Sequence, residues 1–390
     1  MTATASAPDG RHAWLVAGVA TVAMVVTFGT PFSFGVFLVH FEPEYGISAV
    51  ALSTVFAVQL FAFYAGAGLV GVLATRYPAR RLLVACVIAI GALAPAAVVV
   101  DRYAGLLAVF AALGVALGTV YVVLAAVVPR WFRERRGLAT GVFFSGIGVS
   151  LLVMPPIWQL AFVRLGVDRG LLAVLVATAL LCLPAAVLCR RPPWADRPST
   201  GSNTASWLVE LAAGREFRLQ FLGVGLALGW YSLLAAYAVE LFAARGLGEA
   251  AAAAAFGAVG GVSVLSRLAS GAVADRAGPR RPFLAALGCV VVGSLLLAIP
   301  SLATTALAVV CFGVGFGGVA ALYIPLVLRS YAPERGVAVV GVFNVAFGAF
   351  ALGLPPVGRA LIAATGSYLG AVALTGLAAL AAFVCIARTS

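Results

Sequence analysis

Long apolar runs follow one another along the chain, separated by short polar segments. Each run has 18 or more residues, enough for a helix to cross a hydrocarbon core about 30 Å thick. The runs are continuous rather than alternating, which favours helices over the strands of a transmembrane barrel. We therefore predict an all-α membrane protein of about twelve helices. The predicted spans are 14–40, 48–74, 82–100, 104–128, 137–162, 168–190, 218–243, 250–274, 282–299, 303–328, 336–362 and 368–387.

The composition agrees with a lipid environment. The 390 residues are 63% hydrophobic and only 10% charged, too few charges to cover a water-soluble chain of this length. The first run is longer than the apolar core of a secretory signal, and no well-defined cleavage region follows it. We expect it to remain as the first spanning helix.

Arginine is distributed unevenly between the two sides of the predicted membrane. All 25 basic residues are arginines, and 19 of them lie on the cytoplasmic side if the N-terminus is inside. Two lie within predicted helices, Arg267 and Arg359, and four lie in outer loops: Arg102, Arg164, Arg169 and Arg245. This bias follows the positive-inside rule and predicts a multi-pass protein of the plasma or inner membrane with both termini in the cytoplasm. The net charge of +12 thus reflects topology, and we expect no nucleic-acid partner.

Residues for metal, nucleotide or covalent chemistry do not cluster in the sequence. The six cysteines all lie in apolar runs, and His12 and His40 lie at opposite ends of the first predicted helix. The glycine-rich segment 313–318 lies within a predicted span with no strand before it, and no GxxxxGK[ST] sequence is present. We expect no metal, no cofactor and no enzymatic activity.

The second half of the chain repeats the first at an offset of 200 residues. Segments 134–135, 141–143 and 155–156 read ER, GVF and PP, and the same letters recur at 334–335, 341–343 and 355–356. Each half has six spans, an even number, so the two repeats are parallel. We predict an N-terminal half at 1–190, a polar cytoplasmic linker at 191–217 and a C-terminal half at 218–390. Glycines spaced by four predict close helix packing in both halves: Gly114 and Gly118, and Gly313 and Gly317.

Two arginine-rich segments occupy the same place in the repeats, between the second and third helices of each half. They read GVLATRYPARR at 71–81 and GAVADRAGPRR at 271–281, and the second resembles the signature loop of the major facilitator superfamily. The resemblance implies that superfamily's fold, with alternating access to a central cavity and a single chain as the working unit. We expect the loops to latch one conformation by pairing with groups of the neighbouring half. The latch residues are Gly271, Asp275, Arg276, Arg280 and Arg281, and, in the weaker copy with Thr75 for the acid and Pro78 for the glycine, Gly71, Arg76, Arg80 and Arg81.

Two other segments resemble the monocarboxylate transporter family, with the related oxalate/formate antiporter branch. Asp9-Gly10 precedes the first helix, and PRWFRERRGLATGVFFSGIGVS at 129–150 leads into the fifth. The family has an acid-Gly pair with aromatics at the first place and an aromatic-basic-Arg-x-Leu-Ala-x-Gly pattern at the second. Arg11 and His12 depart from the first signature. The resemblance implies a carrier of small organic anions.

Arg267 is the basic residue whose predicted depth needs a functional explanation. It precedes Asp275 by eight residues, about 12 Å along the eighth helix, which is near the midplane. A charge there is costly unless it faces a cavity or a partner, and no acid is predicted at comparable depth. A substrate carboxylate would complete it, and the family resemblance assigns that role to this arginine. By the same counting, we expect Arg359 and Glu240 at the outer interface, with side chains extending to the headgroups.

Further candidates for substrate binding are polar or aromatic residues at similar depth. Tyr121 and Asn344 each lie nine residues from a cytoplasmic arginine, about 14 Å into the membrane. At two places the chain departs from the family: Ser263 replaces an acid and Phe32 replaces a lysine, groups to which proton coupling is attributed. Facilitated diffusion, anion exchange and proton symport therefore remain open. The candidate substrate-binding residues are Arg267, Tyr121, Asn344, Ser263, Phe32 and, more weakly, Tyr323.

The sequence therefore predicts a transporter of small monocarboxylates, such as lactate, pyruvate, oxalate or formate, that works by alternating access. The alternative is a major-facilitator exporter of drugs or other amphipathic metabolites, which would favour an acid in the cavity. The expected partners are a small organic anion, a co-transported proton or an exchanged anion, and the lipid bilayer. The sequence does not distinguish the acid, the direction of transport or the oligomeric state.

The arginine bias makes a prediction about topology. A tag placed after Ser390 should react with an impermeant label only after the cells are permeabilised, because both termini are expected in the cytoplasm. Labelling of this tag on intact cells would overturn the topology.

Overall fold

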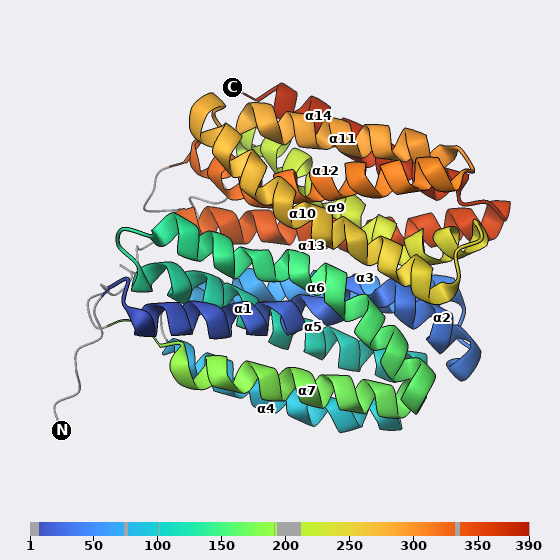
Figure 1. The fold of residues 1–390 in the computed structure, drawn as a ribbon, viewed down its shortest axis with the longest axis horizontal. Coiled ribbons are helices and arrows are strands. Elements are labelled where there is room, and N and C mark those ends of the chain that lie inside the picture. Colours follow the sequence, from blue (N-terminus) through green and yellow to red (C-terminus); the bar gives the residue numbers. More distant parts are fainter. Residues whose placement is uncertain are drawn as a thin grey trace.

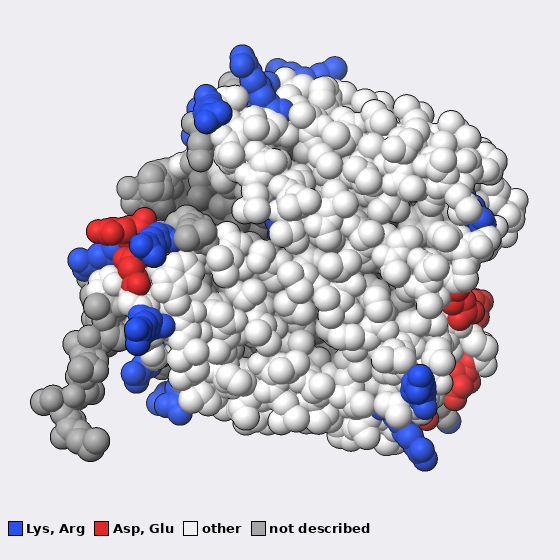
Figure 2. Space-filling model, viewed as in Figure 1, with Lys and Arg blue, Asp and Glu red and all other residues white. Residues whose placement is uncertain are grey.

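The structure is a computed structural model that describes residues 8–73, 77–100, 102–190, 192, 212–331 and 336–389. Within these ranges, twelve helices are long and apolar enough to cross a membrane. They lie side by side along one direction, with arginines and acids gathered at the two ends and an uncharged band between them (Figures 1 and 2). The helices are α1 (Arg11–Phe32), its continuation α2 (Phe34–Tyr45), α3 (Ala49–Leu73), α4 (Ala79–Val99), α5 (Tyr103–Val127), α6 (Arg136–Leu165), α7 (Val167–Leu188), α9 (Arg215–Ala244), α10 (Glu249–Ala277), α11 (Arg280–Ala298), α12 (Leu302–Leu328), α13 (Gly336–Thr365) and α14 (Leu369–Ala387), with a short 3₁₀ turn, η1 (Val128–Trp131), after α5.

Every predicted span corresponds to a helix, and the first span differs in being broken. The chain leaves helical geometry at Ser33, between α1 and α2. Pro31 lies two residues before the break and cannot donate a hydrogen bond to the carbonyl of Thr27, so the last turn of α1 holds one hydrogen bond fewer than a regular helix. Sequence alone predicted one continuous span over 14–40, so the break is a finding of the structure.

The two halves of the sequence form two groups of helices, α1–α7 and α9–α14, that lie against each other in Figure 1. Equivalent helices begin about 200 residues apart: α3 and α10 at Ala49 and Glu249, α6 and α13 at Arg136 and Gly336. The predicted repeat is therefore present in the fold. Most of the predicted linker lies outside the described residues, and its last residues already belong to α9.

Glycines set the closest helix contact in each half at equivalent positions. A Cβ at Gly118 would overlap the carbonyl oxygen of Phe63, so α5 lies directly against the backbone of α3. In the second half, Gly317 of α12 has the same relation to the carbonyl oxygen of Ser263 in α10. The predicted glycine stripes are thus packing surfaces that the repeat has used twice.

Two lateral helix pairs, related by the repeat, join the halves. α6 packs on α10, where a Cβ at Gly257 would be 3.0 Å from the carbonyl oxygen of Leu151. α3 packs on α13, where a Cβ at Gly68 would be 3.1 Å from the carbonyl oxygen of Gly341. At both contacts the small residues bring the two helix backbones close together.

Asp9 fastens the start of α1 to the chain entering α6. Its carboxylate accepts the N–H groups of Arg133, Glu134 and Arg135 at 3.0, 3.2 and 3.0 Å, and its own N–H donates to Trp131. Hydrogen bonding from the Arg133 N–H, with help from the next two amides, lowers the pKa of this carboxyl below its ordinary value. The two segments that resemble monocarboxylate transporters therefore meet in space.

Arg359 and Glu240 were expected to extend separately to the headgroups, and this expectation is wrong. Nη1 of Arg359 lies 2.7 Å from Oε2 of Glu240, and the Arg359 side chain is 5% exposed. The Tyr368 hydroxyl donates to the same carboxylate oxygen at 3.3 Å. Counting residues placed both groups at the same depth, and pairing explains how they are accommodated there better than snorkelling does.

The glycine contacts predict that substitution by alanine changes stability in opposite directions at Gly118 and Gly91. Gly118→Ala should destabilise the protein by about 1–3 kcal/mol, because the new methyl group meets backbone that cannot move aside. Gly91→Ala, in α4, adds the same methyl group where no atom lies within 4 Å, and should be neutral or gain up to about 1 kcal/mol. Unfolding of purified protein in detergent measures both, and equal stabilities for the two variants would contradict the packing argument.

The buried ion pair predicts a cooperative effect. Arg359→Gln should cost about 2–3 kcal/mol, somewhat below the loss for a fully buried pair, because the Glu240 side chain is 21% exposed. Adding Glu240→Gln should recover part of that loss, since the double variant leaves no unpaired charge. A double-variant stability equal to the sum of the single effects would show that the pair does not act as a unit.

Candidate functional site

Arg267 lies on the face of α10 that packs against α6, so it sits where the two halves meet. Its Nη1 donates to the carbonyl oxygen of Phe144 in α6 at 3.1 Å. This hydrogen bond crosses from the C-terminal to the N-terminal half. A group that binds the guanidinium can therefore affect how the halves are held together.

The remaining donors of Arg267 are buried without partners. Nε and Nη2 are both inaccessible and make no hydrogen bond within the described part of the chain. The guanidinium carbon lies 5.5 Å from the ring centre of Phe316, a cation–π contact. No carboxylate from the described residues lies within ion-pair distance of it. An arginine with two adjacent free N–H groups in a water-poor site is a receptor for a planar anion.

Aromatic side chains from both halves surround the guanidinium. Phe316 of α12 stacks on Tyr231 of α9 with ring centres 4.1 Å apart, and Phe32 of α1 lies 5.2 Å from Tyr231. Four tyrosines are close enough to Arg267 to interact electrostatically with it: Tyr231, Tyr64, Tyr121 and Tyr323. The predicted residues Arg267, Phe32, Tyr121 and Tyr323 thus belong to one cluster.

Tyr121 and Tyr323 meet across the interface. Their hydroxyl oxygens are 3.4 Å apart, joining α5 of the first half to α12 of the second. Tyr121 also packs edge-on against Phe28 with ring centres 5.4 Å apart. Tyr323, the weaker candidate in the sequence, is thus a direct partner of Tyr121.

Ser263 and Asn344 are both buried, but they differ in whether their side chains have hydrogen-bond partners. The Ser263 hydroxyl donates to the carbonyl of Gly260 at 2.7 Å, one turn from Arg267 and facing α6. Asn344 is 3% exposed, and its Oδ1 has no hydrogen-bond partner among the residues described. Ser263 therefore replaces an acid without leaving an orphaned group, whereas Asn344 has an acceptor free for a ligand or water.

Sequence reasoning missed three members of the cluster: Tyr231, Tyr64 and Phe316. Tyr64 lies nine residues before the end of α3, within the membrane-spanning part of that helix. Tyr231 lies near the middle of α9. Counting depth for every tyrosine would have found both, but Phe316 carries no polar signal and only the packing of α12 reveals it.

The residues predicted to form latches are only partly described. Arg280 Nη2 donates to the carbonyl of Ala387 at the end of α14, 2.8 Å away, while Arg276, Arg281, Arg80 and Arg81 are exposed. Gly271 lies within α10 and Gly71 within α3; Asp275 lies in α10 with its side chain outside the description, and Arg76 lies outside the described residues. The latch stays a prediction.

Several curated proteins are similar in sequence. An MFS-type transporter, pytF, from Aspergillus terreus is 28% identical over 281 residues, 70% of this chain and 93% of its own length. Monocarboxylate transporter 3 from Rattus norvegicus is 28% identical over 379 residues, 91% of this chain and 75% of its own length. Monocarboxylate transporter 11 from Mus musculus is 30% identical over 285 residues, covering 70% and 61%.

Solved structures share the fold at low identity. The nucleoside transporter NupG matches with a TM-score of 0.78 and 11% identity over 97% of this chain and 100% of its own. A bacterial homologue of the human lysosomal transporter Spinster, in an inward-facing conformation, matches with a TM-score of 0.72 and 14% identity, covering 97% and 98%. Residues 18–354 match the sequence profile of the Major Facilitator Superfamily. The chain therefore belongs to the Major Facilitator Superfamily, a multi-pass membrane transporter that is not an enzyme and resembles the monocarboxylate transporter branch.

Proposed function

We propose that this transporter carries small organic monocarboxylates through a site between its halves, in the plasma or inner membrane with both termini in the cytoplasm. The observation that carries the proposal is the Arg267 guanidinium, which is held between α10 and α6 with Nε and Nη2 unpartnered. A carboxylate can accept from two N–H groups of one guanidinium at once, and it neutralises a charge that is otherwise costly to bury. The similarity to monocarboxylate transporters supports the same substrate class.

The tyrosines around Arg267 suit the rest of such a ligand. Neutral hydroxyls, such as those of Tyr231 and Tyr121, can donate to a carboxylate oxygen without adding a competing negative charge. The Tyr231 hydroxyl is buried and has no hydrogen-bond partner among the described residues, so it has a proton to donate. The aromatic faces favour the apolar part of the acid.

The link between binding and alternating access follows from the Phe144 contact. In the conformation described, Nη1 of Arg267 donates a hydrogen bond to the carbonyl of Phe144 in the opposite half. A carboxylate bound to Nε and Nη2 would leave this hydrogen bond in place and add contacts to the tyrosines of both halves. Binding would therefore change the balance of contacts between the halves, as a carrier's substrate must do.

If transport is coupled to protons, the group that carries the proton must differ from the groups to which coupling is attributed in monocarboxylate transporters. The positions with which the family's coupling is associated hold Ser263 and Phe32, which do not titrate in the ordinary range. We therefore favour exchange of one organic anion for another, facilitated diffusion, or a substrate that crosses with its own proton.

A second candidate function is the export of amphipathic compounds. The observation that favours it is the number of aromatic side chains around the site, including Phe32, Phe316 and Tyr231, which suit a larger apolar cargo. Dependence of binding on the charge at Arg267 distinguishes the two candidates.

Arg267→Gln should weaken binding of a transported monocarboxylate by roughly 10- to 150-fold, because it removes a charge-assisted interaction of about 1.5–3 kcal/mol. Arg267→Lys should recover part of the affinity, since it keeps the charge but loses the planar fork. The measurement is isothermal titration of purified variants with a panel of organic acids, followed by uptake into proteoliposomes.

Arg164→Gln serves as the matched control. Arg164 lies in the last turn of α6 and is exposed, so the same substitution should leave affinity for the acid unchanged. Wild-type affinity in a folded, membrane-inserted Arg267→Gln variant would overturn the carboxylate site and leave an uncharged or cationic cargo as the better explanation.

A further inference from the structure

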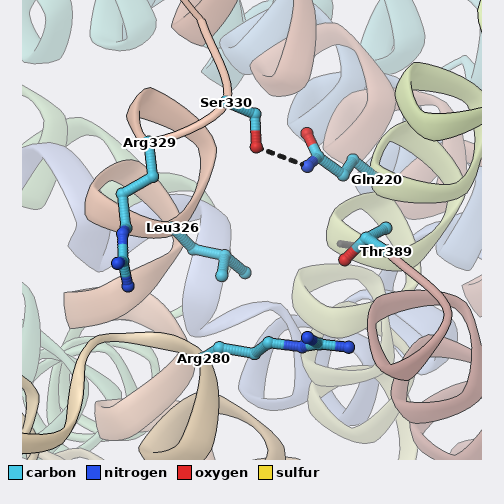
Figure 3. A pocket seen from close by; sticks show the side chains of 6 residues that line it. All are labelled: Gln220, Arg280, Leu326, Arg329, Ser330 and Thr389. Atoms are coloured by element: carbon cyan, nitrogen blue, oxygen red, sulfur yellow. Dashed lines mark hydrogen bonds between the residues drawn. The ribbon is translucent and has the colours of Figure 1, made fainter.

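A polar cavity lies away from the aromatic cluster, at the end of the bundle that carries the termini. It has a volume of about 370 Å³, within the range of small-molecule pockets, and lies among the ends of α9, α11, α12 and α14 (Figure 3). Its lining residues are Gln220, Arg280, Leu326, Arg329, Ser330 and Thr389.

Two arginines give this cavity its charge. Figure 3 shows the Arg280 and Arg329 side chains on different sides of the space, with Leu326 between their bases. Arg280 Nη2 donates to the carbonyl of Ala387, but its Nε is buried and has no partner within the described chain. Neither lining arginine faces an acidic lining residue, because none of the six lining residues is acidic.

The Arg329 side chain lies against Gly278, a glycine that ends α10. Gly278 ends α10 with a φ of 75°, a conformation that favours glycine. A Cβ there would lie 2.8 Å from Nη1 of Arg329, so the guanidinium rests directly on this backbone. The arginine is thereby placed beside the loop that leads into α11 and Arg280.

A hydrogen-bonded chain supplies a neutral donor to the same cavity. The Tyr331 hydroxyl donates to Oε1 of Gln220, and Nε2 of Gln220 donates to the Ser330 hydroxyl, both at 2.8 Å. Burial, with the nearby Glu216 carboxylate adding to it, raises the pKa of Tyr331 to about 12, so its phenol remains protonated. Ser330 accepts in this chain and keeps its own proton free to donate.

We propose that this cavity binds a phosphate group, as the anion of a phosphate ester. A phosphate offers several acceptor oxygens pointing in different directions, which matches two guanidinium groups and a serine hydroxyl placed around a space. A carboxylate, being planar, is satisfied by one arginine fork and leaves the second arginine unused. The ester is presented either by the headgroup of a phospholipid or by a phosphorylated solute.

A neighbouring cavity argues that the phosphate belongs to the first one. That neighbour has a volume of about 300 Å³, shares Thr389 with the first, and is lined by two arginines, Arg215 and Arg388. It also includes Glu216, whose carboxylate offsets one of these charges and would repel an anion. The anion is therefore best accommodated between Arg280 and Arg329, where it would join the ends of α11 and α12.

The test measures phosphate binding to the full chain in an uncharged detergent and in nanodiscs. Inorganic phosphate and pyrophosphate are titrated calorimetrically into the detergent-solubilised protein. In a second arm, thermal stability is compared in nanodiscs of phosphatidylcholine alone and with added phosphatidylglycerol. Binding in the first arm identifies a solute ester, whereas stabilisation confined to phosphatidylglycerol identifies a lipid headgroup.

Three variants locate the site. Arg329→Gln should weaken phosphate binding at least about tenfold in the arm that shows it, because the substitution removes one charge-assisted partner at an exposed residue. Arg218→Gln removes the same charge from an exposed position of α9 outside the cavity, and should leave affinity within about twofold. Arg267→Gln should also leave phosphate binding intact, since the central site is elsewhere.

The outcomes are decisive in both directions. A loss specific to Arg329→Gln in either arm supports the proposal. Absence of binding in both arms overturns it, and so does an equal loss in Arg218→Gln, which would indicate diffuse attraction to the arginine-rich end. Loss in Arg267→Gln alone would place the anion in the central site and would likewise overturn this second site.

Discussion

The contact between the halves depends on how the protein accommodates buried arginine charges that water does not reach. Arg267 has one N–H on the Phe144 carbonyl, a cation–π contact with Phe316, and two nitrogens, Nε and Nη2, with no hydrogen-bond partner among the described residues. Arg359 solves the same problem in another way, by pairing with Glu240. The fold thus supplies an acidic partner for Arg359 but none, among the described residues, for Arg267. Arg267 is the one that lies between the halves.

Most of the fold could be predicted because its signals are local. The length of each apolar run sets a helix, the arginine bias suggests an orientation, and the repeat shows itself as matching letters at a fixed offset. The break at Ser33 was missed because hydropathy is insensitive to one lost hydrogen bond. The Arg359–Glu240 pair was missed because counting gives depth along a helix and not the direction in which a side chain points.

The residues of the candidate site could be predicted to a similar extent, and those that were missed were missed for a similar reason. Arg267, Tyr121, Tyr323 and Phe32 do lie in one cluster, since unusual residues at midplane depth tend to face the interior. Phe316 could not be found in this way, because a phenylalanine in an apolar run looks the same whether it faces lipid or substrate. Which of its faces a helix turns inward is decided by packing between helices, such as the glycine contact of α12 with α10.

The interrupted first helix makes the two halves structurally unequal. The single non-helical residue Ser33 separates α1 from α2, whereas the equivalent helix α9 runs unbroken for 30 residues. Phe32 ends α1 at this joint and touches Tyr231 on the continuous helix. The two halves of a sequence repeat thus present different backbones at their interface: the half with the continuous α9 carries Arg267, and the half with the interrupted α1–α2 carries Phe32.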